Sequence, residues 1–235
     1  RLFLAQKNNT FFSLSQILFA IWTLFPNYAS PVQFDCHEFL MDLRDKLNTY
    51  YQHKFDSDEF SSIFSWSFKV IESCENCEET RTFITTSSDL ILNSKSSSLV
   101  AAFSEFLKAD SPCSNCQKLC KCEQFFNTLP PTLVIQLGRT RGTEKGLTVI
   151  PPLEELSLND YIDLDKKNEL GDAKYSLSGV VVRPGSGETG HYWADVKKAG
   201  QWYRCDDSNV KPIELSEVLR DDASLLFYIR KGFVA

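Results

Sequence analysis

The sequence has no apolar run long enough to cross a membrane. Its most apolar stretch, residues 11–25, is interrupted by Ser13, Ser15 and Gln16 and stopped by Pro26, so it falls short of the roughly 20 residues that a spanning helix needs. We expect a buried helix here and no membrane partner. No basic segment with an apolar centre and a small-residue cleavage site is visible, and the chain begins at Arg1 rather than Met, so we expect further residues upstream.

Positive charge is also scarce. The 25 Lys and Arg residues face 31 Asp and Glu residues, which gives a net charge of −6 at pH 7. Nucleic-acid modules need clustered cations to neutralise phosphates, so we expect no direct nucleic-acid contact, and a basic partner or substrate tail fits better. The 43% apolar content excludes collagen-like, coiled-coil and disordered classes, and 235 residues allow one large domain or two small ones.

Cysteine is nearly absent outside one cluster. Six of the eight cysteines lie between residues 74 and 122, which leaves only Cys36 and Cys205 elsewhere. A disulfide framework suits a short secreted chain that is stapled throughout, whereas the outer parts of this chain are apolar enough to pack unaided. We therefore expect reduced thiols and an intracellular protein, either cytoplasmic or nuclear.

Two C-x2-C motifs lie within this cluster, and they are formed by Cys74, Cys77, Cys113 and Cys116. Each tight turn can bring two thiolates to one ion, and two such turns complete a closed tetrahedral zinc site, which is structural because no position is open to water. Free buried cysteines or an oxidised pair are the alternatives. Cys120 and Cys122 either replace one ligand or are spare thiols.

The first 58 residues have a helical pattern. Ser30 is placed to cap a helix, and Gln33 can close a capping box with it. Apolar residues then recur at steps of three and four, which predicts an amphipathic helix over about 31–51.

From about residue 59 the pattern changes to short strands and polar turns. Strands are expected over 64–71, 82–92, 132–137, 175–183, 191–197, 201–206 and 225–230, a loop over 94–98 and a short helix over 99–107. Helices come first and an antiparallel sheet last, so the fold class is α+β.

A histidine follows a glycine-rich loop at residues 185–190. If residues 198–201 form a turn, Arg204 lies opposite Asp195, and Asp206 comes within hydrogen-bonding reach of His191. A slip of one residue would bring Asp207 there instead.

The alternation of apolar side chains favours Asp206 and puts Asp207 on the opposite face. The expected buried face of this hairpin consists of Tyr192, Ala194, Val196, Tyr203 and Cys205. A histidine oriented by a carboxylate is the base half of a nucleophilic triad, because the carboxylate fixes the tautomer and favours the imidazolium. A surface His-Asp pair without a catalytic role is the alternative.

Several segments occur in a characteristic order from about residue 33 to 230. They are Gln33-Phe34-Asp35-Cys36-His37-Glu38-Phe39-Leu40, the two cysteine motifs, Leu129-Pro130-Pro131-Thr132-Leu133-Val134-Ile135, Tyr175-Ser176-Leu177-Ser178-Gly179-Val180, Gly190-His191-Tyr192, Trp202-Tyr203-Arg204-Cys205-Asp206-Asp207 and Leu225-Leu226-Phe227-Tyr228. Each alone is weak, but together they are highly specific. The chain resembles the ubiquitin-specific proteases, which are papain-like cysteine deubiquitinases.

This resemblance implies one catalytic domain over 1–235 with a papain-like cysteine protease fold. The implied parts are a remainder of the helical thumb (1–58), zinc-bearing β fingers (mainly 59–128) and a β palm with the His/Asp hairpin (mainly 129–235). The partners it implies are ubiquitin and ubiquitinated proteins, with the three parts gripping the globular body of ubiquitin.

The resemblance also implies roles for individual residues. His191 is the implied general base, Asp206 orients it, and Asp207 assists at the oxyanion. Gln33 and Asp35 are implied to hold the basic, extended tail of ubiquitin.

The chain departs from the family pattern at the nucleophile. The family's cysteine precedes the helix that starts near Gln33, but none of the first 32 residues here is cysteine. Cys36 occupies the family's alanine position on the apolar stripe of the helix, so we interpret it as a core thiol. The segment 137–140 and Arg183 also differ from the family's residues. We therefore expect the domain without its nucleophile segment, inactive as this chain alone.

Three functions follow as hypotheses. The first is thiol-dependent hydrolysis of the (iso)peptide bond after the terminal glycine of ubiquitin, with the nucleophile supplied upstream. The second is an inactive pseudoenzyme that binds ubiquitin, and the third is a zinc-stabilised interaction module unrelated to ubiquitin. The carboxy-terminal segment also resembles family members that act in chromatin-modifying assemblies, which adds a larger assembly as a partner.

Overall fold

The long amino-terminal helix begins after Asp35, not at Ser30. In the computed structural model, which describes residues 14–30, 32–92, 98–108, 110–138, 150–183, 190–219 and 223–232, helix α3 spans Cys36–Phe55. Asp35 Oδ1 accepts hydrogen bonds from the backbone N–H groups of His37 (2.8 Å) and Glu38 (3.2 Å) and so caps the helix. The predicted start is wrong because Ser30 is in extended backbone after the 3-10 helix η1 (Pro26–Ala29).

Helix α2 (Leu14–Leu24) is apolar but largely exposed. Phe19, for example, is 71% exposed, so the expectation of a buried helix is wrong for this segment. Phe25 after it is buried and meets Tyr28 and Phe39 edge-on, which joins η1 to α3. Within the described part of the chain, no helix is both long and apolar enough to span a membrane.

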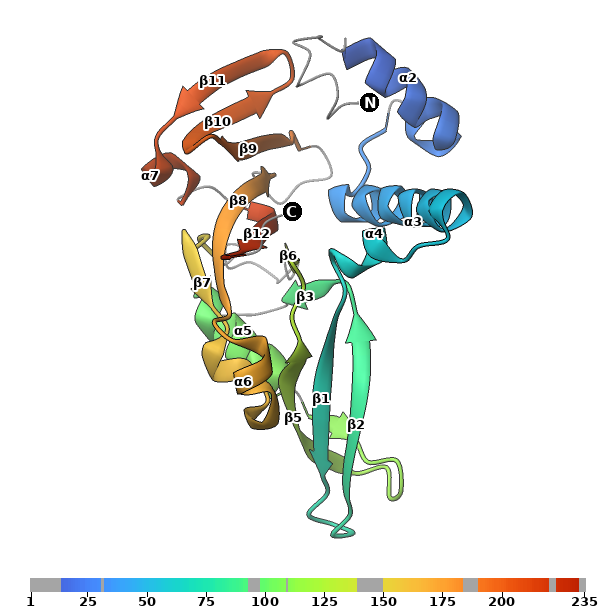
Figure 1. The fold of residues 1–235 in the computed structure, drawn as a ribbon, viewed down its shortest axis with the longest axis vertical. Helices are drawn as coiled ribbons and strands as arrows, with labels where there is room; N and C mark the ends of the chain where they lie inside the picture. Colours follow the sequence, from blue (N-terminus) through green and yellow to red (C-terminus); the bar gives the residue numbers. More distant parts are fainter. Residues whose placement is uncertain are drawn as a thin grey trace.

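The described strands include an antiparallel four-stranded sheet of order β2-β1-β5-β4, at the lower end of Figure 1. Its strands are β1 (Trp66–Ser73), β2 (Thr80–Ser87), β4 (Ser111–Pro112) and β5 (Leu119–Thr128). The strand predicted over 82–92 is two strands, because the chain bends at Ser88 and leaves this sheet. β5 was not among the predicted strands.

The remaining described strands form an eight-stranded sheet, with path β11-β10-β9-β8-β12-β6-β3 and β7 beside β8. Its strands are β3 (Leu90–Leu92), β6 (Thr132–Leu137), β7 (Glu155–Ser157), β8 (Lys174–Val182), β9 (Trp193–Lys198), β10 (Gln201–Asp206), β11 (Asn209–Ile213) and β12 (Ala223–Arg230). β6 and β10 confirm the predicted bounds. The described pairings in this sheet are antiparallel, as expected, except at one edge, where β3 pairs in parallel with β6.

Helix α5 (Leu99–Leu107) confirms the predicted short helix, and most of the loop predicted before it lies outside the described residues. The other short helices are α4 (Glu59–Ser62), η2 (Asn159–Tyr161), η3 (Leu164–Lys166), α6 (Lys167–Leu170) and α7 (Leu215–Val218). One apolar core runs through both sheets and α5. Two tyrosines in it are fully buried with satisfied hydroxyls, because Tyr175 donates to Pro130 O and Tyr228 to Leu153 O, both at 2.7 Å.

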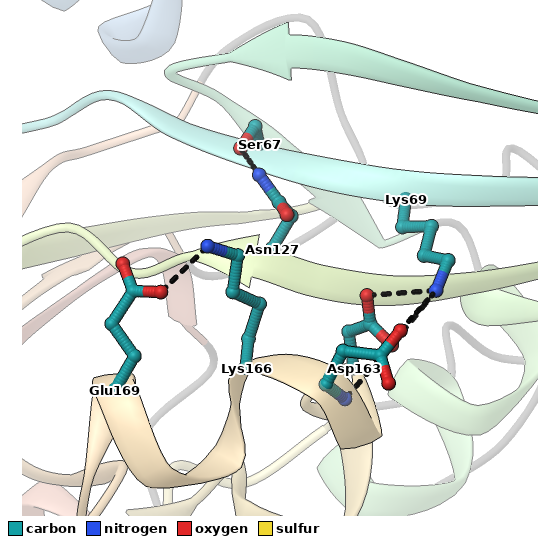
Figure 2. Close-up of polar contacts among 7 residues, drawn as sticks. Ser67, Lys69, Asn127, Asp163, Lys166 and Glu169 are labelled. Atoms are coloured by element: carbon teal, nitrogen blue, oxygen red, sulfur yellow. Dashed lines mark hydrogen bonds and ion pairs between the residues drawn. The ribbon is translucent and has the colours of Figure 1, made fainter.

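The four-stranded sheet is tied to the segment before β8 by Lys69 of β1. Its Nζ lies 3.0 Å from the buried Asp163 and 3.2 Å from Asp165, as the dashed lines in Figure 2 show for Asp163. Asn127 of β5 donates to Ser67 of β1 at 3.1 Å in the same view. The Lys69 ion pairs hold the sheet against the turn of η3, whereas the Asn127–Ser67 bond joins two strands within the sheet.

Helix α3 is anchored to the sheets by Arg44. This side chain is only 10% exposed, pairs with Asp89 Oδ1 at 2.8 Å and donates to Ser88 O at 3.2 Å. Its guanidinium also lies over the Phe64 ring, 4.7 Å from the centroid. These three contacts of Arg44 fix α3 beside the start of β3, at one edge of the eight-stranded sheet. His191 lies toward the other end of the same sheet.

Candidate functional site

The hairpin that carries the candidate base has the predicted register. β9 and β10 pair with Gln201 opposite Lys198 and Arg204 opposite Asp195. Ala199 (φ 49°) and Gly200 (φ 85°) both adopt left-handed backbone, as a two-residue type I′ turn requires. The tight turn therefore sets which side chains face His191.

The burial of the two hairpin faces is the reverse of what we expected. Trp202 and Asp195 are buried, whereas Val196, assigned to the buried face, is 37% exposed. The Asp195 carboxylate can be buried on this face because Arg204 donates a hydrogen bond to each of its two oxygens, both at 2.9 Å. Arg204 also stacks over Trp193. A charge can be buried when it is paired and hydrogen-bonded in this way.

His191 and Asp206 are in direct contact. The imidazole Nε2 lies 2.5 Å from Asp206 Oδ1, which confirms the predicted proximity. If Nε2 carries the proton that is shared with the carboxylate, Nδ1 is left as a proton acceptor. The hydrogen bond that His191 donates to Asp206 raises the pKa of His191, and burial opposes this shift only in part.

Asp207 does not lie on the opposite face of the strand, as we expected. It follows the last residue of β10 in left-handed backbone (φ 51°), in the turn before β11. One carboxylate oxygen of Asp207 lies within 4.8 Å of the corresponding atoms of His191 and Asp206. The turn, rather than strand alternation, brings it back to this site.

Gln33 and Asp35 both have partners within the chain. Gly190 N–H donates to Gln33 Oε1 at 2.9 Å, and Gln33 Nε2 donates to Gly190 O. Asp35 uses Oδ1 for both helix-capping bonds. The structure thus brings Gln33 to the residue before His191, a contact that no local sequence signal could have indicated.

Cys36 is a half-buried thiol at the start of α3, next to Tyr192. Burial, helped by the nearby Asp35 carboxylate, raises the pKa of this thiol to about 11. A nucleophilic cysteine needs the opposite shift. The environment of Cys36 therefore fits a core thiol.

The four cysteines of the two C-x2-C motifs converge at the tip of the four-stranded sheet and could hold a metal ion. The sulfurs of Cys74, Cys77, Cys113 and Cys116 all lie within 4.8 Å of one another. The Cys74–Cys116 and Cys77–Cys113 sulfur distances are 3.5 and 3.7 Å. These separations are too long for a disulfide and close to the roughly 3.8 Å between ligands of a tetrahedral ion with 2.3 Å bonds.

The two cysteine turns share one backbone geometry. In each, the residue four positions after the first cysteine is left-handed, Glu78 at φ 56° and Gln117 at φ 60°. A backbone hydrogen bond from Lys118 lowers the pKa of Cys116 to about 7. Donors of this kind stabilise a thiolate, which is the form that binds metal.

The two extra cysteines lie outside this ligand group. Cys120 Sγ donates to Ser111 O at 3.2 Å, and Cys122 belongs to the main apolar core. Of the two alternatives, the structure favours spare thiols. Arg81 braces the site by contacting Glu72 and Ser114.

Comparison with known proteins places this chain in one family. The family model described as ubiquitin carboxyl-terminal hydrolase matches residues 2–228. The chain therefore belongs to the ubiquitin carboxyl-terminal hydrolase family. The "Probable ubiquitin carboxyl-terminal hydrolase 8" of Schizosaccharomyces pombe (strain 972 / ATCC 24843) is 27% identical over 237 residues, which are 95% of this chain and 51% of that protein.

Solved structures of the same fold agree. The SAGA DUB module Ubp8/Sgf11/Sus1/Sgf73 bound to monoubiquitin contains a chain that is 25% identical, with a TM-score of 0.75 over 91% of this chain and 52% of that chain. The same module bound to ubiquitin aldehyde gives a TM-score of 0.74 at 25% identity, covering 91% and 53%. The α+β fold of the ubiquitin-specific proteases is thus confirmed. The chain spans about half the length of these relatives.

Proposed function

We propose that this chain supplies the general base, and the ubiquitin-binding surfaces around it, for thiol-dependent hydrolysis of the bond after the terminal glycine of ubiquitin. The contact between His191 and Asp206 carries this proposal, because it leaves imidazole Nδ1 able to accept a thiol proton. Membership of the hydrolase family supports it. This proposal keeps the first of the three hypotheses from the sequence and sets aside the third, a zinc-stabilised module unrelated to ubiquitin.

The proposed reaction uses His191 twice. Nδ1 takes the proton of a cysteine thiol, the thiolate attacks the glycine carbonyl, and the imidazolium returns the proton to the leaving lysine amine. The resulting thioester is hydrolysed by water, which gives its proton to the same nitrogen. Asp206 stabilises the imidazolium formed in each half of the cycle.

Asp207 adds to the negative potential around His191 and favours its charged form. We propose this electrostatic role instead of a direct contact with the oxyanion, because a carboxylate repels developing negative charge. Cys36 is not the nucleophile in this proposal, since its pKa is raised to about 11. The thiol is supplied from outside this chain.

For the ubiquitin tail, we propose a contact with Asp35. Its Oδ1 is used by the helix cap, and Oδ2 is the acceptor that remains for a basic side chain of the tail. Gln33 lies beside the same path, against Gly190. Support comes from the related Ubp8 structure, which is bound to monoubiquitin.

The metal that we propose for the cysteine cluster is zinc. Four sulfur ligands at near-tetrahedral separations suit this ion, and a closed ligand set gives it a structural role. The division into thumb, fingers and palm, and the cytoplasmic or nuclear location, stay predictions. The multi-subunit assembly of the related Ubp8 supports a larger assembly as a further proposal.

The test of function pairs binding with turnover. We expect this chain to bind ubiquitin in isothermal titration calorimetry and not to cleave a fluorogenic ubiquitin carboxy-terminal amide by itself. Cleavage that is abolished by Cys36→Ser would show that Cys36 is the nucleophile and overturn our interpretation of that thiol. Absence of ubiquitin binding would instead contradict the ubiquitin proposal as a whole.

A further inference from the structure

The backbone at His191 lies outside the ladder of the sheet. β9 begins at Trp193, which pairs with Val182 of β8, and its pairing with β10 begins at Ala194, opposite Cys205. His191 is therefore two residues beyond the hydrogen-bonded strand. Something other than the ladder must fix the backbone from which its imidazole projects.

Gln33 supplies two hydrogen bonds at this point. Its side-chain amide accepts from Gly190 N–H at 2.9 Å and donates to Gly190 O, so both polar groups of one backbone residue are satisfied by one side chain. The two residues are 157 positions apart in the sequence. The pair joins the segment before α3 directly to the residue that precedes His191.

Arg183 also lies close to Gly190. A Cβ at position 190 would lie 2.9 Å from Arg183 Nε and 3.4 Å from its Cγ, so Gly190 has no room for a side chain while Arg183 keeps its place. The Arg183 guanidinium also lies over the Tyr192 ring, 5.5 Å from the centroid. Gly190 is thus contacted by the Gln33 amide and has the Arg183 side chain close to its Cα.

We propose that Gln33 is a positioning residue that clasps Gly190 and thereby fixes His191 against Asp206. This inference rests on the proposed role of His191 as base. It gives Gln33 a task different from the expected contact with the ubiquitin tail, because both of its amide groups already have partners. Arg183 provides the surface against which Gln33 holds the glycine.

The test uses Gln33→Met, which keeps the length and neutrality of the side chain but removes both hydrogen bonds. The chain has only three histidines, so the titration of His191 can be followed by NMR with His37 and His53 as internal references. We expect the pKa of His191 to fall toward the ordinary value of about 6.5, because a loosened backbone weakens the bond to Asp206. Gln16→Met, an exposed glutamine on α2, is the matched control and should leave His191 unchanged.

Gln33→Asn is the second variant, for use if Gln33→Met does not fold. Its amide is one methylene too short to make both bonds, so it should move the His191 titration in the same direction. Ubiquitin affinity should stay within about twofold of wild type in either variant.

An unchanged His191 titration in a folded variant would overturn the proposal that Gln33 positions His191. If the affinity for ubiquitin then falls tenfold or more, Gln33 is a tail-binding residue. If the wild-type chain fails to bind ubiquitin, the proposed function fails, but the NMR titration still tests the clasp on its own.

Discussion

Asp195 and Arg204 face each other across β9 and β10 and form a two-pronged ion pair, with both nitrogen–oxygen distances at 2.9 Å. The carboxylate is fully buried, and the arginine also stacks on Trp193, which lies next to the His191 ring. The pair therefore forms part of the packing directly behind the candidate base.

We predict that Asp195→Ala lowers the free energy of unfolding by about 3 to 5 kcal/mol, because it removes the fully buried carboxylate to which the partly buried Arg204 donates two hydrogen bonds. Urea denaturation measures this change. Adding Arg204→Leu should recover part of the loss, which a double-mutant cycle would detect as coupling. Glu169→Ala, which removes an exposed partner of Lys166, is the control and should cost less than about 1 kcal/mol. Equal effects of Asp195→Ala and the control would contradict the prediction.

For the cysteine cluster, we predict one bound zinc per chain in elemental analysis. Cys113→Ser should lower both the zinc content and the melting temperature, since structural zinc contributes directly to folding free energy. Cys120→Ser is the matched control, because Cys120 packs beside Cys74 and Cys113 but its sulfur donates to Ser111 O and lies outside the group of four sulfurs. Loss of zinc on Cys120→Ser but not on Cys113→Ser would mean that the ligand set is wrong.

The pH dependence of His191 is a third prediction. Asp206 raises the pKa of His191 in the folded chain above its unfolded value of about 6.5. The stabilisation that this pair gives the folded chain is therefore fully present below about pH 6.5, and it is lost as the pH rises through the folded-state pKa of His191. Asp206→Asn should lower the pKa of His191 in an NMR titration, and Asp207→Asn should lower it less. In a longer form of the protein that carries a nucleophile, Asp206→Asn should reduce turnover by roughly 10² to 10⁴.

Asp207→Asn should affect turnover less than Asp206→Asn does. A larger loss for Asp207→Asn, with ubiquitin binding unchanged, would transfer the orienting role to Asp207. Ubiquitin affinity, measured separately, should change little in both variants because neither carboxylate is proposed to contact the bound protein.

The proposed tail contact of Asp35 can be separated from its capping role. Asparagine is as good a helix cap as aspartate, so Asp35→Asn should keep the melting temperature while reducing ubiquitin affinity roughly three- to tenfold through loss of charge. Asp35→Ala should lose affinity and also about 1 kcal/mol of stability. Raising the salt concentration should narrow the affinity gap between wild type and Asp35→Asn. Equal ubiquitin affinities for these two proteins at low salt would exclude the contact.

Local rules were enough to predict parts of this fold. The β9–β10 register followed from a turn that contains Gly200, and the bounds of β6 followed from a largely apolar run. The bounds of α5 were also predicted correctly. β5 was missed although its cysteines, Cys120 and Cys122, alternate with exposed residues, because these cysteines were considered only as replacement ligands or spare thiols and not as part of a strand. The alternation of apolar and polar residues that is typical of a half-buried strand was therefore present in this part of the sequence.

Other features depend on contacts that no local pattern contains. Both Ser30 and Asp35 satisfy the rules for a helix cap, and the choice between them depends on packing between Tyr28 of η1 and Phe39 of α3. The prediction of which hairpin face is buried failed because Asp195 forms an ion pair with Arg204, and this ion pair allows the face that carries the two charges to pack against the core. The Gln33–Gly190 contact joins segments whose proximity only the complete fold establishes.

The cysteine cluster packs as a small group of its own, apart from the main apolar core. Each C-x2-C turn closes one hairpin, β1 with β2 and β4 with β5, so each half can take shape from neighbours in the chain. The tip of the four-stranded sheet can therefore open as a separate cooperative unit while the large sheet stays intact. Removal of metal should then accelerate hydrogen exchange of the amides at the tip, while the exchange of the amides in β6 and β12 stays slow.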